Sequence, residues 1–149
     1  MSVEFVSGDL FKNEYACDAF SHGCNTIGAM GAGIASGFKQ RYPQMYDQYK
    51  WLCQSKQFNP GDVFFWFEPF KPSVLNLASQ VGVGSCAKLE YIEKCFERIE
   101  SRYNDWGIKK LAMPRIGAGL GGLDWQDVKS LIEKIFTNSR LVVMVYESF

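Results

Sequence analysis

Two glycine-rich segments contain the residues whose types and spacing could do chemistry. They are "NTIGAMGAGIASG", residues 25–37, and "MPRIGAGLGGLDW", residues 113–125. Glycine has no Cβ, so several backbone N–H groups of such a segment can turn toward one anion, and the N-terminus of a following helix adds a favourable dipole. Either segment alone fits a tight strand-to-helix connection equally well. Two of them in the same setting favour a clamp around a diphosphate.

The glycine patterns of the common nucleotide-binding folds fit less well. Neither segment has the Gly-Lys-Ser/Thr ending of a Walker A motif, so the sequence does not predict triphosphate hydrolysis. Gly117–Gly122 matches the dinucleotide fingerprint GxGxxG, and a strand ending at Glu147 follows the next helix. Only two residues come after Glu147, whereas a Rossmann domain would need further strands. We therefore do not expect a Rossmann-type dehydrogenase.

Three polar residues near these segments could orient or attack a ligand. Asn25 offers a hydrogen-bond donor and an acceptor, which suits a ribose with adjacent hydroxyls, and it is equally a common turn residue. Asp9, in "SGDLF", could accept a hydrogen bond from an adenine amino group, although a cap of the following turn is favoured. A lone histidine such as His22 in a strand is more often a core residue than a catalyst, but its ordinary pKa near 6.5 permits acid or base work.

Alternating strands and helices must position these residues. Residues of high strand propensity recur in six short runs, at residues 3–7, 18–24, 62–68, 73–79, 110–114 and 141–147. Helical spacing recurs between them, over 88–106, from an N-cap at Asp124 to Asn138, from about Gly33 to Pro43, and again from Pro43. The alternation predicts an α/β sandwich with helices on both faces of a mixed sheet, and the two runs within 62–79 predict a hairpin.

Composition limits the class of protein. One domain over residues 1–149 is expected, because 149 residues with 47% hydrophobic content can bury one substantial core. Sixteen basic residues balance sixteen acidic ones, so we expect no strong general nucleic-acid binding. No apolar run approaches the roughly 20 residues that span a bilayer, and the first residues lack a signal-peptide pattern, which predicts a cytoplasmic protein without a membrane partner. Five cysteines without a CxxC pair, and a single histidine, predict reduced thiols, no metal site and no cofactor.

Three motifs in this order resemble a macrodomain. They are "VSGDLF", "HGCNTIGAMGAGIASGFKQRYP" and "MPRIGAGLGGLDW", and the resemblance runs from Val3 to Tyr146. It is nearest to the branch with the terminal ADP-ribose protein glycohydrolase, the DNA ADP-ribosyl glycohydrolase antitoxins and the yeast-type ADP-ribose-1''-phosphate phosphatase. The resemblance implies a three-layer sandwich with a mixed six-stranded sheet, and ADP-ribose or an ADP-ribosylated molecule as the partner.

The resemblance also implies roles for matching residues. The adenine would meet Asp9 and Leu10, and the distal ribose would meet Asn25. The resemblance does not say which aromatic residue covers the adenine; Tyr146 or Phe149, at the end of the last strand, could do so, although a place in the core or at the terminus is favoured for each. The diphosphate and the near side of the distal ribose would be held from one side by Gly31, Ala32, Gly33, Ile34 and Ala35, and the diphosphate from the other side by Ile116, Gly117, Ala118, Gly119, Leu120, Gly121 and Gly122.

Two departures from the family bear on catalysis. Glycohydrolase members carry a catalytic lysine where this chain has Gln80. The protein glycohydrolase also carries an aspartate where this chain has Gly121, although the antitoxins share the "GLGGL" of this chain. The yeast-type phosphatase has a histidine in register with His22, so His22 and Asn25 form the expected catalytic centre, with His22 as general base or acid. The sequence thus predicts a hydrolase of an ADP-ribose derivative, either a phosphatase or a deADP-ribosylase, with a non-catalytic ADP-ribose reader as the alternative.

Overall fold

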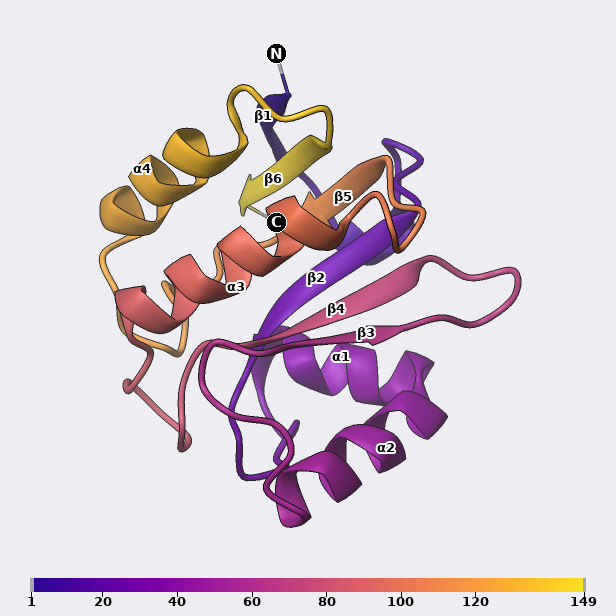
Figure 1. Ribbon diagram of the computed structural model, residues 1–149, viewed down its shortest axis with the longest axis vertical. Coiled ribbons are helices and arrows are strands. Elements are labelled where there is room, and N and C mark those ends of the chain that lie inside the picture. The colour runs from indigo at the N-terminus through magenta and orange to yellow at the C-terminus, as the bar shows by residue number, and fades with distance from the viewer. Residues whose placement is uncertain (1, 149) are drawn as a thin grey trace.

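One six-stranded mixed sheet organises the molecule. The computed structural model describes residues 2–148, and the strands lie in the order β1-β6-β5-β2-β4-β3 (Figure 1). Neighbouring strands are parallel except β3, which runs antiparallel to β4 and forms the predicted hairpin with it. The mixed six-stranded sheet is therefore confirmed. The strand bounds are β1 Val3–Ser7, β2 Ala19–Cys24, β3 Val63–Trp66, β4 Ser73–Ala78, β5 Lys110–Met113 and β6 Val142–Ser148.

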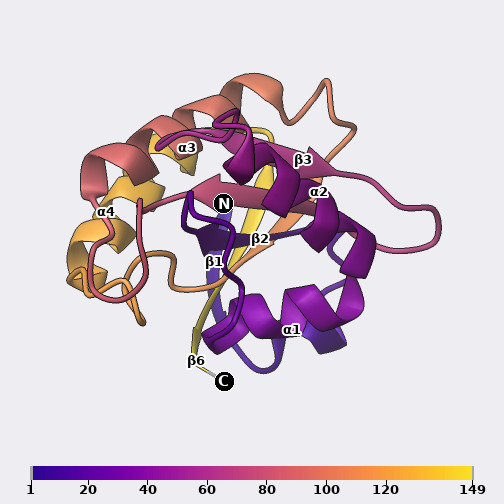
Figure 2. The same cartoon turned by 90° about the horizontal axis from the view of Figure 1, so that it is seen from below.

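Helices cover both faces of this sheet, as the alternation predicts. Helices α1 and α2 lie against one face, and α3 and α4 lie against the other (Figures 1 and 2). The alternation of β4 shows why: Val74 and Ala78 pack toward α1 and α2, whereas Leu75 and Leu77 pack toward α3 and α4. The helix bounds are η1 Leu10–Lys12, α1 Gly33–Arg41, α2 Pro43–Gln54, α3 Leu89–Arg102 and α4 Trp125–Phe136.

Most helices begin and end at or near the residues that the sequence predicts. Pro43 opens α2 at its first position. Asp124 caps α4 by accepting a hydrogen bond of 2.9 Å from the backbone N–H of Gln126. Helix α3 ends at Arg102 rather than near 106, because the Ile108 N–H bonds back to the Tyr103 carbonyl and Gly107 takes a left-handed conformation.

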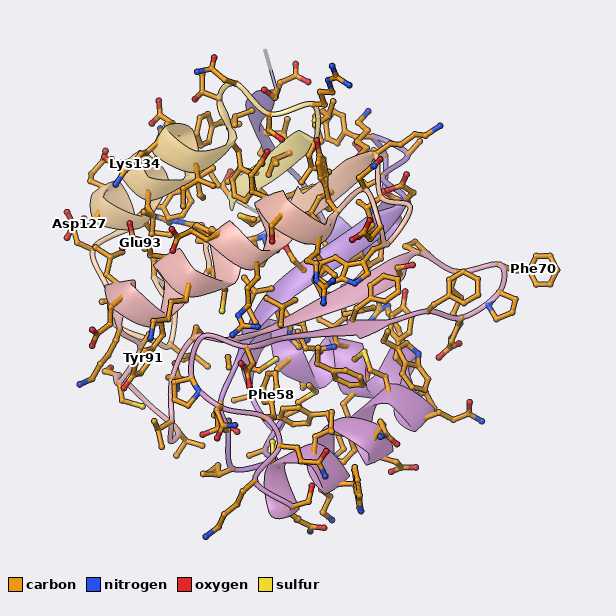
Figure 3. The ribbon with its side chains drawn as sticks, in the orientation of Figure 1. Phe58, Phe70, Tyr91, Glu93, Asp127 and Lys134 are labelled. Atoms are coloured by element: carbon orange, nitrogen blue, oxygen red, sulfur yellow. The ribbon has the colours of Figure 1, made fainter. Side chains whose placement is uncertain are left out.

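Helices α3 and α4 are held together by apolar packing more than by an ion pair. Lys134 of α4 approaches Glu93 of α3, as Figure 3 shows, with 3.6 Å between Nζ and the carboxylate. The Lys134 side chain is largely exposed and that of Glu93 partly exposed, and such surface pairs contribute little to stability. Beneath them the rings of Phe96 and Phe136, both fully buried, meet edge to face at 5.5 Å. Within residues 2–148, no helix has both the length and the apolar character needed to cross a bilayer.

The carboxyl ends of β5, β2 and β4 lie side by side at one edge of the sheet. β2 pairs with β4 over its whole length, from Ala19 opposite Ser73 to Cys24 opposite Ala78. On its other side β2 pairs with β5. The loops that follow these three parallel strands must therefore meet, and ligands gather at such an edge in α/β folds.

The Asp124 cap gives a test of the fold. We expect Asp124→Ala to lower the free energy of unfolding by about 1 kcal/mol, because it removes the acceptor for an N–H at the start of α4. The matched control is Asp127→Ala, since Asp127 is exposed in the same first turn (Figure 3) and makes no cap. Urea unfolding measures both; equal losses would contradict the capping role.

Candidate functional site

A cavity of about 490 Å³ lies at this edge of the sheet. That volume suits a small-molecule ligand. It is formed by the loops after β2, β4 and β5 and by the first turn of α1. Most of the predicted ligand-binding residues line it: Asn25, Gly31, Ala32, Gly33, Ile34, Ala35, Ile116, Gly117, Ala118, Gly119, Leu120 and Gly121.

Other predicted site residues do not line this cavity. The Asp9 carboxylate caps η1, accepting a hydrogen bond of 2.9 Å from the N–H of Phe11, and Leu10 is fully buried. Gly122 lies beyond the lining residues. Tyr146 is 1% exposed and belongs to the core, and Phe149 lies outside the described residues. The structure therefore brings the two glycine-rich loops together without bringing the expected adenine contacts into the same cavity.

His22 is also absent from the cavity wall. Its ring is fully buried and stacks on Phe38 of α1 with 4.0 Å between ring centroids. In β2 successive side chains point to opposite faces, and His22 points into the layer under α1. The expected role of His22 as a base that touches water in the cavity is thus at odds with its position, because the core encloses its ring.

Burial keeps the His22 ring neutral, although its hydrogen bond partly opposes this. Nε2 lies 2.6 Å from Oδ1 of Asn76, whose amide nitrogen donates to the Phe64 carbonyl. Oδ1 can only accept, so the His22 Nε2–H must donate to it. Burial lowers the pKa of His22 from 6.5 to about 4, and the bond to Asn76 opposes this in part. The ring is therefore uncharged at neutral pH.

Cys24 does not supply a nucleophile either. Its sulfur lies 3.5 Å from Nε2 of His22, and the side chain is buried in the same layer. Burial, the largest cause, raises the pKa of the Cys24 thiol well above 9. A protonated thiol is a weak nucleophile. The pair Cys24 and His22 consequently resembles a hydrogen-bonded core element rather than a catalytic dyad.

The N-terminus of α1 forms one wall of the cavity. Its N-cap residue is Ala32, which makes no side-chain cap, so the first N–H groups of the helix have no capping partner. Gly33, with φ of +61°, turns the chain into the helix at this point. The positive end of the helix dipole and the free N–H groups together favour an anion here.

The loop after β5 forms the opposite wall. Glycine is required at two of its positions, because an added Cβ at Gly117 would lie 2.5 Å from Cδ1 of Ile92, and one at Gly121 would lie 2.7 Å from the Gly117 carbonyl oxygen. The backbone N–H groups of Gly119, Leu120 and Gly121 have no acceptor within residues 2–148. This wall therefore also offers unused donors.

The two departures from the family have structural reasons. Gln80 donates through Nε2 to the carbonyls of Gly82 and Gly84, at 2.8 and 3.1 Å, and so holds the loop after β4 in shape. Any side chain at 121 would collide with Gly117 and Ala87, so an aspartate does not fit this backbone. Both positions serve the shape of the cavity rather than acid–base chemistry.

Asn25 lines the cavity, but most of the hydrogen-bonding groups of its side chain are already bonded within the protein. Its Oδ1 accepts hydrogen bonds from the N–H groups of Ile27 and Ala29, each at 3.2 Å, and its Nδ2 donates to the Ala29 carbonyl at 2.8 Å. Asn25 is thus both the turn residue and the cavity residue that the sequence left as alternatives. One of its two amide protons is left for a ligand.

Sequence reasoning missed a third loop and a charge. Residues 79–84, "SQVGVG", follow β4 and add Ser79, Val83 and Gly84 to the cavity wall. A strand followed by glycines was the signal, as in the other two loops. Arg115 also lines the cavity, its guanidinium 5.1 Å from the Trp125 ring centroid. It is the one lining residue in the described chain with a side chain charged at neutral pH. Residues 2–148 contain no cluster of three side chains able to hold a metal ion.

Comparison with known proteins decides the family. The Macro domain family model matches residues 21–132. This chain belongs to the Macro domain family. Its sequence is 30% identical to ADP-ribose glycohydrolase OARD1 of Homo sapiens over 147 residues, which covers 97% of this macrodomain and 90% of the human protein.

Two bacterial proteins with DNA ADP-ribosyl glycohydrolase or DarTG in their names are also similar to this macrodomain. A DNA ADP-ribosyl glycohydrolase of Thermus aquaticus is 30% identical over 149 residues, which covers 97% of this chain but only 41% of the length of that relative. The solved structure of Thermosipho africanus DarTG in complex with ADP-ribose superposes with a TM-score of 0.90 at 26% identity, covering 98% of this chain and 41% of that one. The macrodomain thus spans about two fifths of each of these proteins.

The burial of His22 predicts a pH dependence of stability. Its pKa is about 4 in the fold against an ordinary 6.5, so the unfolded chain binds more protons between these values, and the fold loses about 3 kcal/mol as the pH falls from 6.5 to 4. Above pH 6.5 this contribution is constant. His22→Gln removes the titrating group and should flatten this part of the profile. Urea unfolding at several pH values measures it, and parallel profiles of the two proteins would contradict the prediction.

Proposed function

We propose that this macrodomain binds ADP-ribose in the cavity and hydrolyses an ADP-ribose derivative there. The observation that carries the proposal is the pair of facing walls, the α1 N-terminus and the loop after β5, both with unused N–H donors. A diphosphate is the part of ADP-ribose that needs such donors. No acidic side chain lines the described cavity, and Arg115 adds positive charge, so an anion is favoured throughout.

The names of the relatives support hydrolysis at the distal ribose. Two of them are named as ADP-ribosyl or ADP-ribose glycohydrolases. In such a reaction the oxygen of water forms a bond to the anomeric carbon of the distal ribose, the bond from that carbon to the attached group breaks, and the attached group leaves with a proton. In the proposed pose Asn25 contacts this ribose and the backbone donors hold the diphosphate, so the cavity contributes position and electrostatics.

A phosphatase reaction has less support from this site. It relied on His22 as the base or acid, and the ring of His22 lies outside the cavity, where burial lowers its pKa to about 4 and makes it a weak base. We therefore place the deADP-ribosylase reaction ahead of the ADP-ribose-1''-phosphate phosphatase reaction.

A non-catalytic reader of ADP-ribose is the second candidate. One observation favours it: the lining residues of the described chain include no histidine, aspartate, glutamate or lysine, and burial raises the pKa of the Cys24 thiol. A reader needs only the donors and the shape of the cavity. Turnover therefore separates the two candidates, whereas binding is common to both.

Gly119 offers a test of the binding site that leaves the fold intact. An added Cβ there would meet no atom within 4 Å, and Gly119 lines the cavity. We expect Gly119→Val to weaken ADP-ribose binding at least tenfold in titration calorimetry and to change the free energy of unfolding by about 0.5 kcal/mol or less. Unchanged binding would reject this pose, and wild-type protein that fails to bind millimolar ADP-ribose would remove both candidates.

A turnover assay then decides between enzyme and reader. Purified protein is incubated with ADP-ribosylated DNA, ADP-ribosylated protein and ADP-ribose-1''-phosphate, and the products are separated by chromatography. We expect release of ADP-ribose from one of the first two, and loss of that release in Asn25→Ala because its amide orients the distal ribose. Binding of ADP-ribose without turnover of any of the three would support the reader instead.

A further inference from the structure

Tyr49 of α2 contacts Asn25 from behind the cavity. Its side chain is fully buried and does not line the cavity, and its hydroxyl lies 2.8 Å from both the carbonyl oxygen and the side-chain Oδ1 of Asn25. The proposed reaction assigns no role to this hydroxyl. We propose that Tyr49 is a positioning residue, which holds the Asn25 amide in place together with the N–H groups of Ile27 and Ala29 and thereby supports the recognition of the distal ribose. This inference rests on the proposed function.

The contacts of Asn25 allow only one orientation of its amide. Three donors meet Oδ1: the N–H groups of Ile27 and Ala29, and the hydroxyl of Tyr49, whose one proton is shared with the Asn25 carbonyl oxygen. Rotation of the amide by 180° would place its NH₂ group against these donors and its oxygen against the Ala29 carbonyl, which Nδ2 now contacts. The two backbone N–H groups would then face another donor and the Ala29 carbonyl another acceptor, which is costly, whereas the Tyr49 hydroxyl can also accept and does not oppose the rotation.

A fixed amide presents only a donor to the cavity. The two lone pairs of Oδ1 are already shared among three donors, whereas Nδ2 uses one of its two protons on Ala29. From the sequence, Asn25 offered either a donor or an acceptor to a ribose. The structure narrows this to a donor, so the group that Asn25 recognises is a hydrogen-bond acceptor, such as a hydroxyl oxygen of the distal ribose.

The contact of the Tyr49 hydroxyl is the shortest of the three contacts to Oδ1. It is shorter than the two backbone contacts, 2.8 Å against 3.2 Å. The ring that carries the hydroxyl is held by the edge-to-face contact with buried Phe58, at 5.7 Å between centroids; Phe58 is labelled close to α2 in Figure 3. Burial raises the pKa of Tyr49, so its hydroxyl remains a donor. The loop itself includes Gly28 in a left-handed conformation and depends on such outside support.

The neighbouring Tyr46 provides a matched control. It lies three residues earlier on α2, and its hydroxyl donates to the carbonyl of Gly28 at 3.3 Å. It therefore supports the same loop from the same helix but does not touch the Asn25 amide. Tyr46→Phe and Tyr49→Phe each remove one oxygen atom, so a difference between them reports on Asn25 rather than on loop support in general.

The experiment compares two ligands, ADP-ribose and ADP, by titration calorimetry. ADP lacks the distal ribose, so it does not sense Asn25. We expect Tyr49→Phe to weaken ADP-ribose binding about tenfold, which corresponds to the loss of about one hydrogen bond between the Asn25 amide and the ligand. The same variant should weaken ADP binding less than twofold. Tyr46→Phe should change both less than twofold. Equal weakening of both ligands in Tyr49→Phe, or no weakening of either, would overturn the inference.

A second variant tests the donor role without altering Tyr49. Asn25→Asp keeps an oxygen for the donors around Oδ1 but has no N–H for the ligand, and it also sets an oxygen against the Ala29 carbonyl and adds a negative charge to the cavity wall. It should therefore weaken the binding of both ligands, and weaken that of ADP-ribose at least tenfold more than that of ADP. Undiminished ADP-ribose binding would overturn the inference. If the wild type binds neither ligand, the proposed function fails; if it binds ADP-ribose and only the variants behave otherwise than expected, the inference alone fails.

Discussion

The pairing of β2 between β4 and β5 is the constraint on which the site depends. These parallel strands end at the same edge, so the three loops that follow them are forced together, although they lie far apart in the sequence. β4 is buried along its whole length, which fixes its register against β2 from Ser73 to Ala78. A slip of one residue would turn every side chain of these strands to the opposite layer, and the cavity would lose its walls.

The walls of the cavity are made of backbone rather than of side chains. Gly117 and Gly121 allow the loop after β5 to fold closely on itself and on α3, and Ala32 leaves the start of α1 without a side-chain cap. The N–H groups thus freed would be costly if they were buried without partners. At the surface of a cavity they are solvated until an anion replaces the water. This explains why a site for an anion can be built with Arg115 as its single charged lining residue in the described chain.

Buried polar groups in the layer next to the cavity support this backbone site. His22 and Asn76 bond to each other within one layer of the sandwich, and Tyr49 bonds to Asn25 at the boundary between that layer and the cavity. Each of these polar groups has a specific partner, which is what makes its burial tolerable. They hold the strand ends and the first loop in one arrangement, and in the proposed function they affect the ligand only through the position of the residues that line the cavity.

The sequence by itself determined the strand runs, the helix caps, the hairpin and the two glycine loops, because these depend on local periodicity, on proline and aspartate at helix starts, and on the absence of Cβ. It also placed most of the cavity residues by family resemblance. Only the tertiary structure decided that His22 lies in the core and that Asn25, three residues later, lies at the cavity. The reason is that strand alternation and the packing of Phe38 set which side chain reaches the cavity. The link between Tyr49 and Asn25 was also invisible in the sequence, since it joins residues of different elements whose meeting depends on how α2 packs on the sheet.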